Sequence, residues 1–599
     1  MSTPDENRVC SVDLLRAWAE NAPNEVATFH RNSSAEWEPT TWSALWLEVQ
    51  RAAVAFAELG LAPGDRLGIL ARTCREWQLC ELAGALAGAS VIGIDPNASG
   101  EQIAWIAEDA GLTFVIVDTI EHLAKIPLST RQRFARTLVI DARPGDTLDD
   151  GAAPLRDAID RAPQAPHIVS HCDPNATAIL IYTSGTTGAP KGIEYTHEQL
   201  MIACRAMLDE FPDLRERNRF VCWLPMSALF QRMINLVAMA SRSVTYFVED
   251  PRTVVAVARE VHPTVFFAVP RFYEKLHEGI RDGIAKQTGI RRRLAETALA
   301  VGIERARLIR TGRQPGLLVT AQHAVLEPLV LRKIRDAMGG EIKWMITGSA
   351  AAPAWLLESF HGIGWRLLEA YGITENPVPI AANKPAAFKL GSVGKPFAMN
   401  DIRLSDDGEV QVRGPAVFRG YRGQTPGSDI FTADGYYRTG DIGRFDDEGF
   451  LFLTGRISEL IKTSTGRRIS VVGVEEVYRQ SRYVDQIVVI GRNRPCLTAL
   501  VSLNAAAVNA GTASQSVAGP KNGAAVSAEA IRLVEGDLET LGERLAQHER
   551  VRAFRVFDEA PSVENGLITA TLKLRRDRIE ARYADLIDEM YVHIARRPQ

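Results

Sequence analysis

The sequence lacks the features that would place it across a membrane or on a nucleic acid. Its longest uncharged apolar run, Leu82–Ile94, falls short of the ~20 residues that a membrane-spanning helix needs. The net charge of -4 offers no bulk attraction to nucleic acid, and aromatic and basic residues do not cluster in a stacking pattern. We therefore expect no nucleic-acid partner and at most peripheral membrane contact.

Cysteine is also scarce, and its spacing matches neither a disulfide framework nor a metal site. The odd number of cysteines predicts reduced thiols, most of them small buried hydrophobes. The N-terminal stretch "MSTPDENRVCSVD" is polar and carries acids, so it does not resemble a secretory signal. These features predict a cytoplasmic location. The seven cysteines are Cys10, Cys74, Cys80, Cys172, Cys204, Cys222 and Cys496.

The chain is long and has the composition of a globular protein. At 599 residues it exceeds the ~250–300 at which a single core stops growing, so two or more domains are expected. Amphipathic helical patterns alternate with short β-branched runs such as "GDRLGIL", "SVIGID", "FVIVD" and "AILIYT". This order predicts an α/β fold with βαβ units and mostly parallel sheets.

Two stretches depart from the alternation. Between Tyr273 and Ile342 an arginine-rich helical insertion follows, whose basic face is either a docking surface or, as we favour, a solvated helix face. After Asp441 the pattern becomes rich in strands, and the low-complexity stretch 504–530 predicts a mobile loop within a small C-terminal domain.

The stretch "IYTSGTTGAPKG", Ile181–Gly192, combines glycines, hydroxyl side chains and one lysine. Small residues allow close backbone approach to a ligand, and exposed N–H groups, hydroxyls and a positive charge can bind phosphate oxygens. The spacing is not that of a P-loop, because only two residues separate Gly185 from Gly188 and glycine follows Lys191. The alternatives are a polyphosphate-binding loop and a plain surface turn.

Three later segments supply the other groups that ATP requires. "YGITE" (371–375) has an aromatic ring, a hydroxyl and a carboxylate, and "YRTGD" (437–441) has a carboxylate after a tight turn. "GRISELIKTSTGRRIS" (455–470) adds Arg456 and a second flexible glycine loop. Together with the first loop they provide a face for a base, an acceptor for ribose hydroxyls, a metal ligand and cations.

These segments and "GEVQVRGP", in this order and spacing, resemble the signature motifs of the adenylate-forming superfamily of acyl-CoA synthetases, adenylation domains and luciferases. The stretches "TVFFAVPRFYEKLHEGI", "GSVGKP" and "VENGLITATLKLRR" are most similar to long-chain fatty acyl-CoA synthetases. The resemblance implies an AMP-binding adenylation domain over residues 1–457, with the helical insertion at about 280–340, and a mobile α+β C-terminal domain over 458–599.

The resemblance also implies roles for individual residues. The β,γ-phosphates of ATP would be cradled by Thr183, Ser184, Gly185, Thr186, Thr187, Gly188 and Lys191. Adenine would stack on Tyr371, with Gly372 beside it, next to the backbone of Gly348, Ser349 and Ala350. Thr374 would contact the α-phosphate, Glu375 and Thr183 would hold magnesium, Asp441 and Arg456 would bind the ribose, and Lys573 would serve adenylation.

The implied reaction joins a medium- or long-chain fatty acid to ATP as acyl-AMP and then to coenzyme A, as in acid–thiol ligases. Three positions depart from the long-chain pattern: Ala228 and Gln231 replace a histidine and a glutamate near the acyl pocket, and Ser458 replaces the usual Asp or Lys hinge. Two alternatives therefore stay open: an acyl-AMP ligase that loads an acyl carrier protein, and a degenerate, non-catalytic acyl-nucleotide binding protein.

Overall fold

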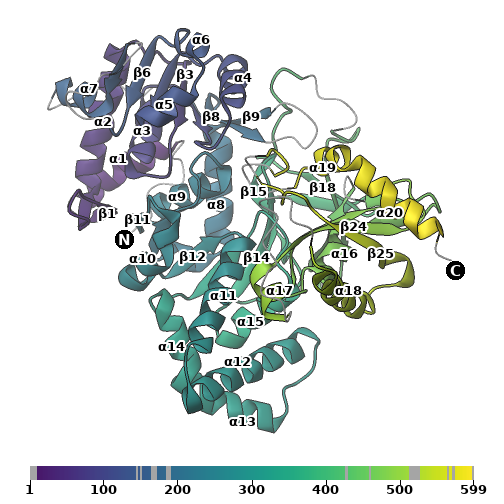
Figure 1. Ribbon diagram of the computed structural model, residues 1–599. Coiled ribbons are helices and arrows are strands. Elements are labelled where there is room, and N and C mark those ends of the chain that lie inside the picture. Colours follow the sequence, from purple (N-terminus) through teal and green to yellow (C-terminus); the bar gives the residue numbers. More distant parts are fainter. Residues whose placement is uncertain are drawn as a thin grey trace.

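The computed structural model describes residues 10–142, 146, 148, 151–163, 172–183, 190–424, 430–457, 460–511, 526–562, 565–568 and 574–596. Within these ranges the strands form six sheets, flanked by helices (Figure 1). The α/β class with parallel-rich sheets is confirmed.

The largest sheet has seven strands in the order β7-β6-β5-β3-β4-β8-β9, and every neighbouring pair is parallel except β8–β9. Its strands are apolar on both faces because helices cover both. Leu67 and Ile69 of β3 belong to one core with α2 and α3, whereas Val115 and Val117 of β5 belong to another with α4. The strands are β3 (Arg66–Leu70), β4 (Ser90–Ile94), β5 (Phe114–Val117), β6 (Arg136–Val139), β7 (Ala152–Pro154), β8 (Thr177–Thr183) and β9 (Lys191–Thr196).

The helices around this sheet begin at well-capped positions. Thr41 caps α2 and Ser99 forms a capping box with Gln102 at the start of α4, so the first N–H groups of both helices are satisfied. The helices are α1 (Ser11–Asn21), α2 (Trp42–Glu58), α3 (Arg75–Leu86), α4 (Gly100–Ala110), α5 (Ile120–Lys125), α6 (Leu128–Arg131) and α7 (Leu155–Arg161).

Two further sheets extend the large core. One has the order β10-β11-β1-β2 and the other β12-β13-β14-β15-β16. Their strands are β1 (Val26–Arg31), β2 (Trp37–Thr41), β10 (Arg219–Cys222), β11 (Val244–Phe247), β12 (Val265–Ala268), β13 (Trp344–Thr347), β14 (Leu367–Ile373), β15 (Asn376–Ala382) and β16 (Lys395–Pro396). The helices between them are α8 (His197–Glu210), α9 (Leu229–Ala240), α10 (Val254–Val261), α11 (Pro270–Ala285) and α15 (Ala354–Ile363).

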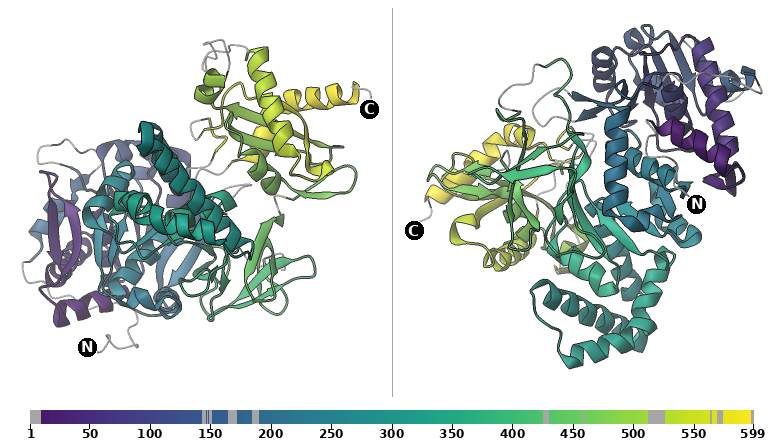
Figure 2. Two further views of the ribbon diagram at one scale, coloured as in Figure 1. Left: turned by 90° about the horizontal axis from the view of Figure 1, so that it is seen from below. Right: turned by 180° about the vertical axis from the view of Figure 1, so that it is seen from behind.

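The C-terminal part contains its own cores. The antiparallel sheet β17-β18-β19-β20 ends at Arg456, and its buried residues Val410, Val412 and Leu451 still belong to the large core, whereas residues 461–591 form two separate hydrophobic clusters around the sheet β23-β24-β25. Figure 2 shows this part beside the larger one. The strands are β17 (Asp401–Leu404), β18 (Glu409–Arg413), β19 (Tyr437–Phe445), β20 (Leu451–Arg456), β21 (Leu460–Lys462), β22 (Arg468–Ser470), β23 (Val484–Ile490), β24 (Leu497–Leu503) and β25 (Val551–Val556).

The helices of this part correct one expectation about 504–530. Both ends of that stretch are helical rather than loop, because α17 (Ala505–Gly511) and α18 (Ala528–Gly542) occupy them, and 512–525 lie outside the described residues. Alanine-rich ends favour helix intrinsically, and Val508, Ala530 and Val534 are buried against the C-terminal core. The other helices are α16 (Val471–Tyr478), α19 (Arg576–Arg582) and α20 (Ala584–Arg596). The domain boundary at 457/458 stays a prediction.

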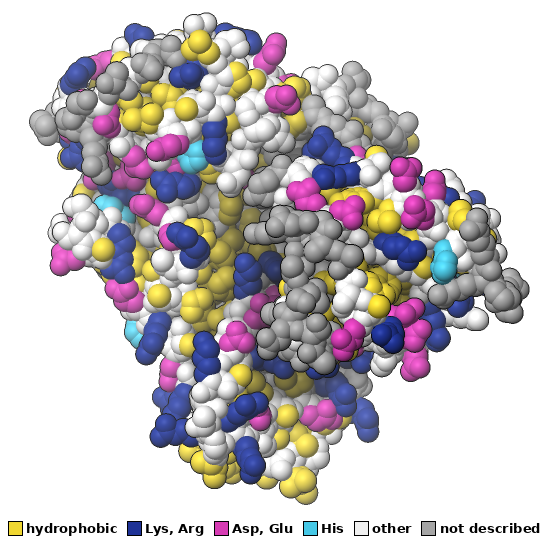
Figure 3. All heavy atoms as spheres, in the orientation of Figure 1, with side chains coloured by type: hydrophobic (Ala, Val, Ile, Leu, Met, Phe, Trp, Pro, Cys, Tyr) yellow, Lys and Arg dark blue, Asp and Glu magenta, His cyan; other side chains and the backbone are white. Residues whose placement is uncertain are grey.

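The arginine-rich region is helical and projects from the large core (Figure 1). It contains α12 (Gly289–Arg310), α13 (Leu317–Leu326), a π-helical turn (Glu327–Leu331) and α14 (Arg332–Arg335). Ile290 and Leu317 are 82% and 91% exposed, and Figure 3 shows basic and apolar side chains side by side at this end. No helix in the described part of the chain has the length and apolarity to span a bilayer.

Two glycines let α12 approach α15 closely. A Cβ placed on Gly302 would lie 2.3 Å from the carbonyl oxygen of Gly362, and one on Gly362 would lie 2.6 Å from the backbone nitrogen of Ile303. In both cases the added Cβ would clash with backbone atoms of the facing helix, so the clash can be removed only if the two helices move apart. The crossing therefore depends on the absence of a side chain at both positions.

We expect Gly302→Ala to destabilise the protein by about 1–3 kcal/mol, the usual cost of overpacking. The matched control is Gly279→Ala on α11, where an added Cβ meets nothing within 4 Å. This control should instead stabilise by up to ~1 kcal/mol through helix propensity. Urea unfolding gives the free energy of unfolding of both variants. If the two substitutions changed it in the same direction, the close-packing argument would be refuted.

Candidate active site

The hairpin β8–β9 carries the two ends of the glycine-rich loop. Thr183 pairs with Lys191 in the antiparallel register, so both lie where the hairpin opens. The Lys191 ammonium lies 4.6 Å from the centre of the Tyr421 ring, a cation–π contact. The intervening predicted phosphate ligands Ser184, Gly185, Thr186, Thr187 and Gly188 lie outside the described residues.

The turn between β14 and β15 brings Thr374 and Glu375 to this hairpin. The buried Tyr195 hydroxyl, on β9, donates a hydrogen bond to the Thr374 carbonyl. The Tyr421 hydroxyl donates to Glu375 Oε1 at 2.8 Å. Tyr421 therefore contacts both the lysine of the first motif and the carboxylate of the second.

Asp441 joins the second and third motifs. It is only 4% exposed, yet the Tyr371 hydroxyl donates to its Oδ2 at 2.5 Å and Arg456 Nε lies 2.8 Å from its Oδ1. Burial, followed by the charge of Asp441, raises the pKa of Tyr371 well above its usual value, so its hydroxyl stays protonated and donates. Asp441 and Arg456 are also register partners on β19 and β20.

The Gly348–Ala350 segment follows β13 and lies beside Tyr371. A Cβ on Gly348 would lie 3.4 Å from the carbonyl oxygen of Ala370, the residue before Tyr371. Ser349 has a φ of 68°, in the left-handed region that a residue with a side chain seldom adopts. Ser349 and Ala350 are exposed, so their backbone groups are accessible to a ligand.

The two departures near the expected acyl pocket occupy different environments. Ala228 is exposed at the N-cap position of α9. Gln231 is 1% exposed, and its Oε1 accepts from the backbone nitrogens of Leu224, at 3.1 Å, and Trp223, at 3.4 Å. Its amide group donates to Asn235 Oδ1 at 2.8 Å, so Gln231 fixes the turn before α9. A pocket-lining role for either residue stays a prediction.

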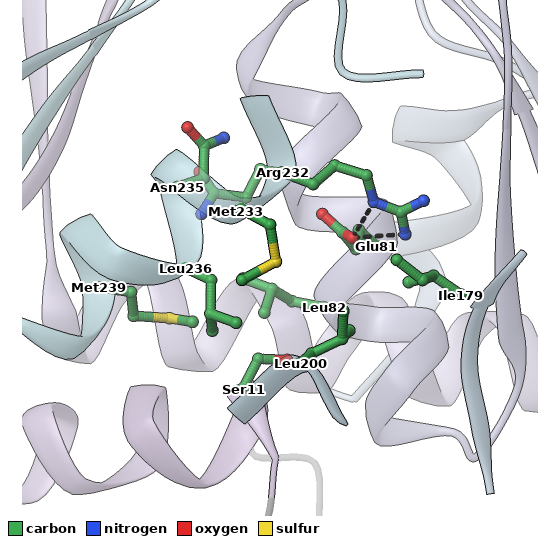
Figure 4. A pocket seen from close by; sticks show the side chains of 11 residues that line it. Ser11, Glu81, Leu82, Ile179, Leu200, Arg232, Met233, Asn235, Leu236 and Met239 are labelled. Atoms are coloured by element: carbon green, nitrogen blue, oxygen red, sulfur yellow. Dashed lines mark hydrogen bonds and ion pairs between the residues drawn. The ribbon is translucent and has the colours of Figure 1, made fainter. Parts of the chain in front are cut away.

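A small cavity lies between α1, α3, α8 and α9 (Figure 4). Its volume of about 40 Å³ suits one or two waters and is too small for an acyl chain. The Arg232–Glu81 ion pair, at 2.6 Å, lies on its wall. None of the residues with an expected role at ATP lines this cavity, and Ser458 and Lys573 lie outside the described residues.

Sequence reasoning missed the two tyrosines that hold the site together. Tyr195 follows the buried alternation of "GIEYT", but no local signal shows that its hydroxyl reaches residue 374. Tyr421 lies in "FRGYRG", and an aromatic ring between glycines and arginines is the one local signal that could have indicated a functional role for it. Their contacts join residues about 180 and 46 positions apart, which only the fold reveals.

Comparisons with known proteins agree with this arrangement. The model of the AMP-binding enzyme family matches residues 15–422, and that of the AMP-binding enzyme C-terminal domain matches 458–595. The chain belongs to the AMP-binding enzyme family. The resemblance to adenylate-forming enzymes is thereby confirmed.

Relatives and solved structures extend the match to nearly the whole chain. The long-chain-fatty-acid–CoA ligase FadD15 of Mycobacterium bovis is 29% identical over 578 residues, covering 95% of this chain and 94% of that protein. The long-chain-fatty-acid–CoA ligase ACSBG2 of Xenopus laevis is 28% identical over 607 residues, covering 93% and 80%.

Two solved structures share the fold at low identity. The anthranilate CoA ligase AuaEII in complex with anthranoyl-AMP has a TM-score of 0.70 at 20% identity, covering 96% of this chain and 97% of that one. The A domain of the carboxylic acid reductase from Segniliparus rugosus, in complex with AMP and a carboxylic acid, has a TM-score of 0.74 at 19% identity, covering 98% and 95%. The fold is therefore that of adenylate-forming enzymes.

A buried carboxyl group underlies the segment beside Tyr371. Glu369 on β14 is 7% exposed, and its Oε2 has no hydrogen-bond partner among the described residues. Burial raises the pKa of Glu369 to about 8, although the backbone N–H groups of Ala352 and Gly391 oppose the shift. Glu476 of α16 adds a smaller repulsion.

This shift makes stability depend on pH. Below pH ~4.5 Glu369 is protonated in both states, whereas between ~4.5 and ~8 only the unfolded chain ionises, so stability falls as pH rises. We expect Glu369→Gln to be more stable than the wild type by an amount that grows from pH 5 to pH 8 and then levels off. Urea unfolding at several pH values measures it, and a constant difference would mean that Glu369 is ionised in the folded protein.

Proposed function

We propose that the chain activates a medium- or long-chain fatty acid with ATP and then transfers the acyl group to coenzyme A. The observation that supports this most is the convergence of Lys191, Glu375 and Asp441 from three different sheets. A nucleoside triphosphate needs a cation at its phosphates, a carboxylate at its metal ion and an acceptor at its ribose hydroxyls. Lys191, Glu375 and Asp441 supply these groups in that order. The long-chain fatty acid ligases among the relatives favour a fatty acid as the substrate.

In the first step a carboxylate oxygen of the fatty acid attacks the α-phosphorus of ATP, and pyrophosphate leaves. The two reactants repel each other, so the protein must hold them in line and neutralise their charge. Lys191 and the loop Thr183–Gly188 would bind the β,γ-phosphates, and Thr374 would contact the α-phosphate. Lys573 would place its ammonium between the carboxylate and the α-phosphate, where negative charge develops.

The nucleoside would lie between Asp441 and the Gly348–Ala350 backbone. A carboxylate offers about four acceptor sites, and Asp441 uses one oxygen for Tyr371 and the other for Arg456. The remaining lone pairs can accept two ribose hydroxyls. Tyr371 would present its ring to adenine while its hydroxyl fixes the carboxylate.

Magnesium fits the donors at the β14–β15 turn. It prefers one or two carboxylates together with phosphate oxygens and waters, and Glu375 supplies one carboxylate whose orientation Tyr421 fixes. The hydroxyl of Thr183 would be a further ligand. The bound ion would supply charge neutralisation at the phosphates.

In the second step the thiol of coenzyme A loses its proton and attacks the acyl carbonyl carbon, and AMP leaves. Residues 458–599 would rotate about Ser458 between the steps, withdrawing Lys573 and admitting the thiol. This motion would let adenylation, which needs Lys573, and thiol attack, which needs coenzyme A, take place in turn at the same acyl carbonyl group.

The test is acid-dependent pyrophosphate release with Mg-ATP over a panel of acids from about C6 to C20 together with aryl acids. We expect release with medium- or long-chain acids, and AMP and a thioester once coenzyme A is added. The control variant Lys573→Ala should release pyrophosphate about 10²–10³ times more slowly. Pyrophosphate without a thioester, restored by an acyl carrier protein, would identify a carrier-loading ligase, and no release with any acid would identify a non-catalytic binder.

A second test concerns the ribose site. Asp441→Asn keeps an acceptor but removes the charge, and a hydrogen bond to a charged group contributes about 1.5–3 kcal/mol, so kcat/KM for ATP should fall about 10- to 100-fold. The KM for the fatty acid should change little. The matched control is Asp434→Asn, a 53% exposed carboxylate before β19, which should leave both constants unchanged. If kcat/KM fell equally for ATP and for the fatty acid, the substitution would have distorted β19 instead.

A further inference from the structure

Two thiols and an imidazole meet at a place that the proposed reaction does not use. The ligand atoms of Cys10, Cys172 and His197, which we call the thiol–imidazole cluster, all lie within 4.8 Å of one another. Cys10 and His197 are buried, at 0% and 5% exposed, and Cys172 is half-buried. In the part of the chain that the structure describes, no other group of three such ligands comes together.

A carboxylate adjoins the cluster. The Cys10 thiol donates to Asp13 Oδ2 at 3.1 Å, while Asp13 Oδ1 forms an ion pair with Arg16 at 3.2 Å. The Asp13 side chain is 20% exposed, and its position in the first turn of α1 directs it to the residue that precedes the helix. Four donors of the kinds that bind transition metals are therefore assembled: two sulfurs, one imidazole nitrogen and one carboxylate oxygen.

The backbone holds the segments of the cluster in place. Cys10 is the N-cap residue of α1, whose apolar face lies in the large core. The segment after Cys172 is tied to the start of α8, because the nitrogens of His197 and Glu198 donate to the carbonyls of Ala176, at 3.3 Å, and Pro174, at 3.0 Å. The arrangement is thus fixed by three elements remote in sequence, which is why the cysteine spacing gave no signal.

We propose that Cys10, Cys172 and His197, with Asp13 as fourth ligand, form a tetrahedral structural site for a zinc-type divalent ion. With bonds of about 2.3 Å to sulfur and about 2.0–2.1 Å to nitrogen and oxygen, a tetrahedral site separates its ligand atoms by roughly 3.3–3.8 Å. The ligand atoms of Cys10, Cys172 and His197 lie within 4.8 Å of one another, so binding requires them to approach by about 1–1.5 Å at most, and Asp13 Oδ2 already lies 3.1 Å from Cys10 Sγ. Binding displaces the two thiol protons to solvent, and all four positions are filled by protein.

A disulfide between the two cysteines is the competing use of the thiols, but it would involve neither the imidazole nor the carboxylate. The presence of both additional donors is what distinguishes a metal site from a cysteine pair.

The site would join the N-terminal helix to the base of the hairpin β8–β9. Thr177 and Thr196 pair at that base, next to His197, and Thr183 and Lys191 pair at the opposite end. An ion at the base would therefore stabilise the strands that present the glycine-rich loop, without contact with the reacting groups. This role is independent of which acid the enzyme activates.

The experiment is metal analysis of the reduced, purified full chain, followed by titration of the metal-free protein with Co²⁺. We expect about one zinc per chain, and with Co²⁺ the thiolate charge-transfer and visible absorption bands of tetrahedral coordination. Cys172→Ser and His197→Ala should each weaken metal binding by more than the roughly 10- to 100-fold that loss of an outer-shell partner causes. The matched control Cys496→Ser, on the other half-buried cysteine, should bind as the wild type does.

Thermal unfolding gives a second readout. Zinc should raise the unfolding temperature of the wild type and of Cys496→Ser but not that of His197→Ala. The proposal is overturned if the reduced wild type shows no thiolate bands with Co²⁺, or if Cys496→Ser loses binding as Cys172→Ser does. It is also overturned if the protein purified without reductant holds a Cys10–Cys172 disulfide and, after reduction, binds neither ion. Because the Co²⁺ titration uses the wild type, a variant that fails to fold does not remove the test.

Discussion

The site depends on the burial of one carboxylate. Asp441 lies almost out of contact with water, and a buried charge is costly unless hydrogen bonds and an opposite charge compensate it. Arg456 supplies the charge from the neighbouring strand, and Tyr371 supplies the hydrogen bond from another sheet. Removing either partner would leave the carboxylate under-compensated, so β14 and β19 are held at a fixed spacing. The expected nucleoside site is built across that spacing.

The expected phosphate end of the site is fixed in a similar way by the segment 416–422. Arg422 donates its backbone N–H to the Gly192 carbonyl at 2.9 Å and forms an ion pair with Glu194 at 2.5 Å, so this segment is fastened to β9. Tyr421 then reaches both Lys191 and Glu375. A cation and a carboxylate are thereby kept near each other by an uncharged group between them, which leaves both available to phosphate and metal.

The sequence predicts the parts of this arrangement that depend on local pattern. The strands in "SVIGID" and "AILIYT" were predictable because their short apolar runs are local signals, and the ordered motifs predicted the family. The contacts of Tyr195 and Tyr421 were not predictable, because a tyrosine's hydroxyl partner is set by tertiary packing. The two helical ends of 504–530 were missed because low complexity was given more weight than the helix propensity of alanine.

The same reasoning explains why the thiol–imidazole cluster escaped a search by spacing. Cys10, Cys172 and His197 come from three segments, and each segment is placed by a different cause: a helix N-cap, the lead into a strand, and the first turn after a hairpin.

Two energetically unfavourable local features lie at the expected adenine end of the site. Ser349 adopts a left-handed backbone conformation. Glu369 has a buried carboxyl group whose pKa is raised by desolvation. The two residues lie in the same region because Glu369 accepts a hydrogen bond from the backbone of Ala352. A strained backbone or a buried carboxyl group raises the free energy of the folded state, and it persists only where many surrounding contacts hold it in place. Here β13 and β14 pair through Thr347, directly before Gly348, and Glu369, two residues before Tyr371, so the pairing fixes both sides of the expected base site. The protein therefore gives up stability next to the exposed backbone segment that we expect to face the nucleotide.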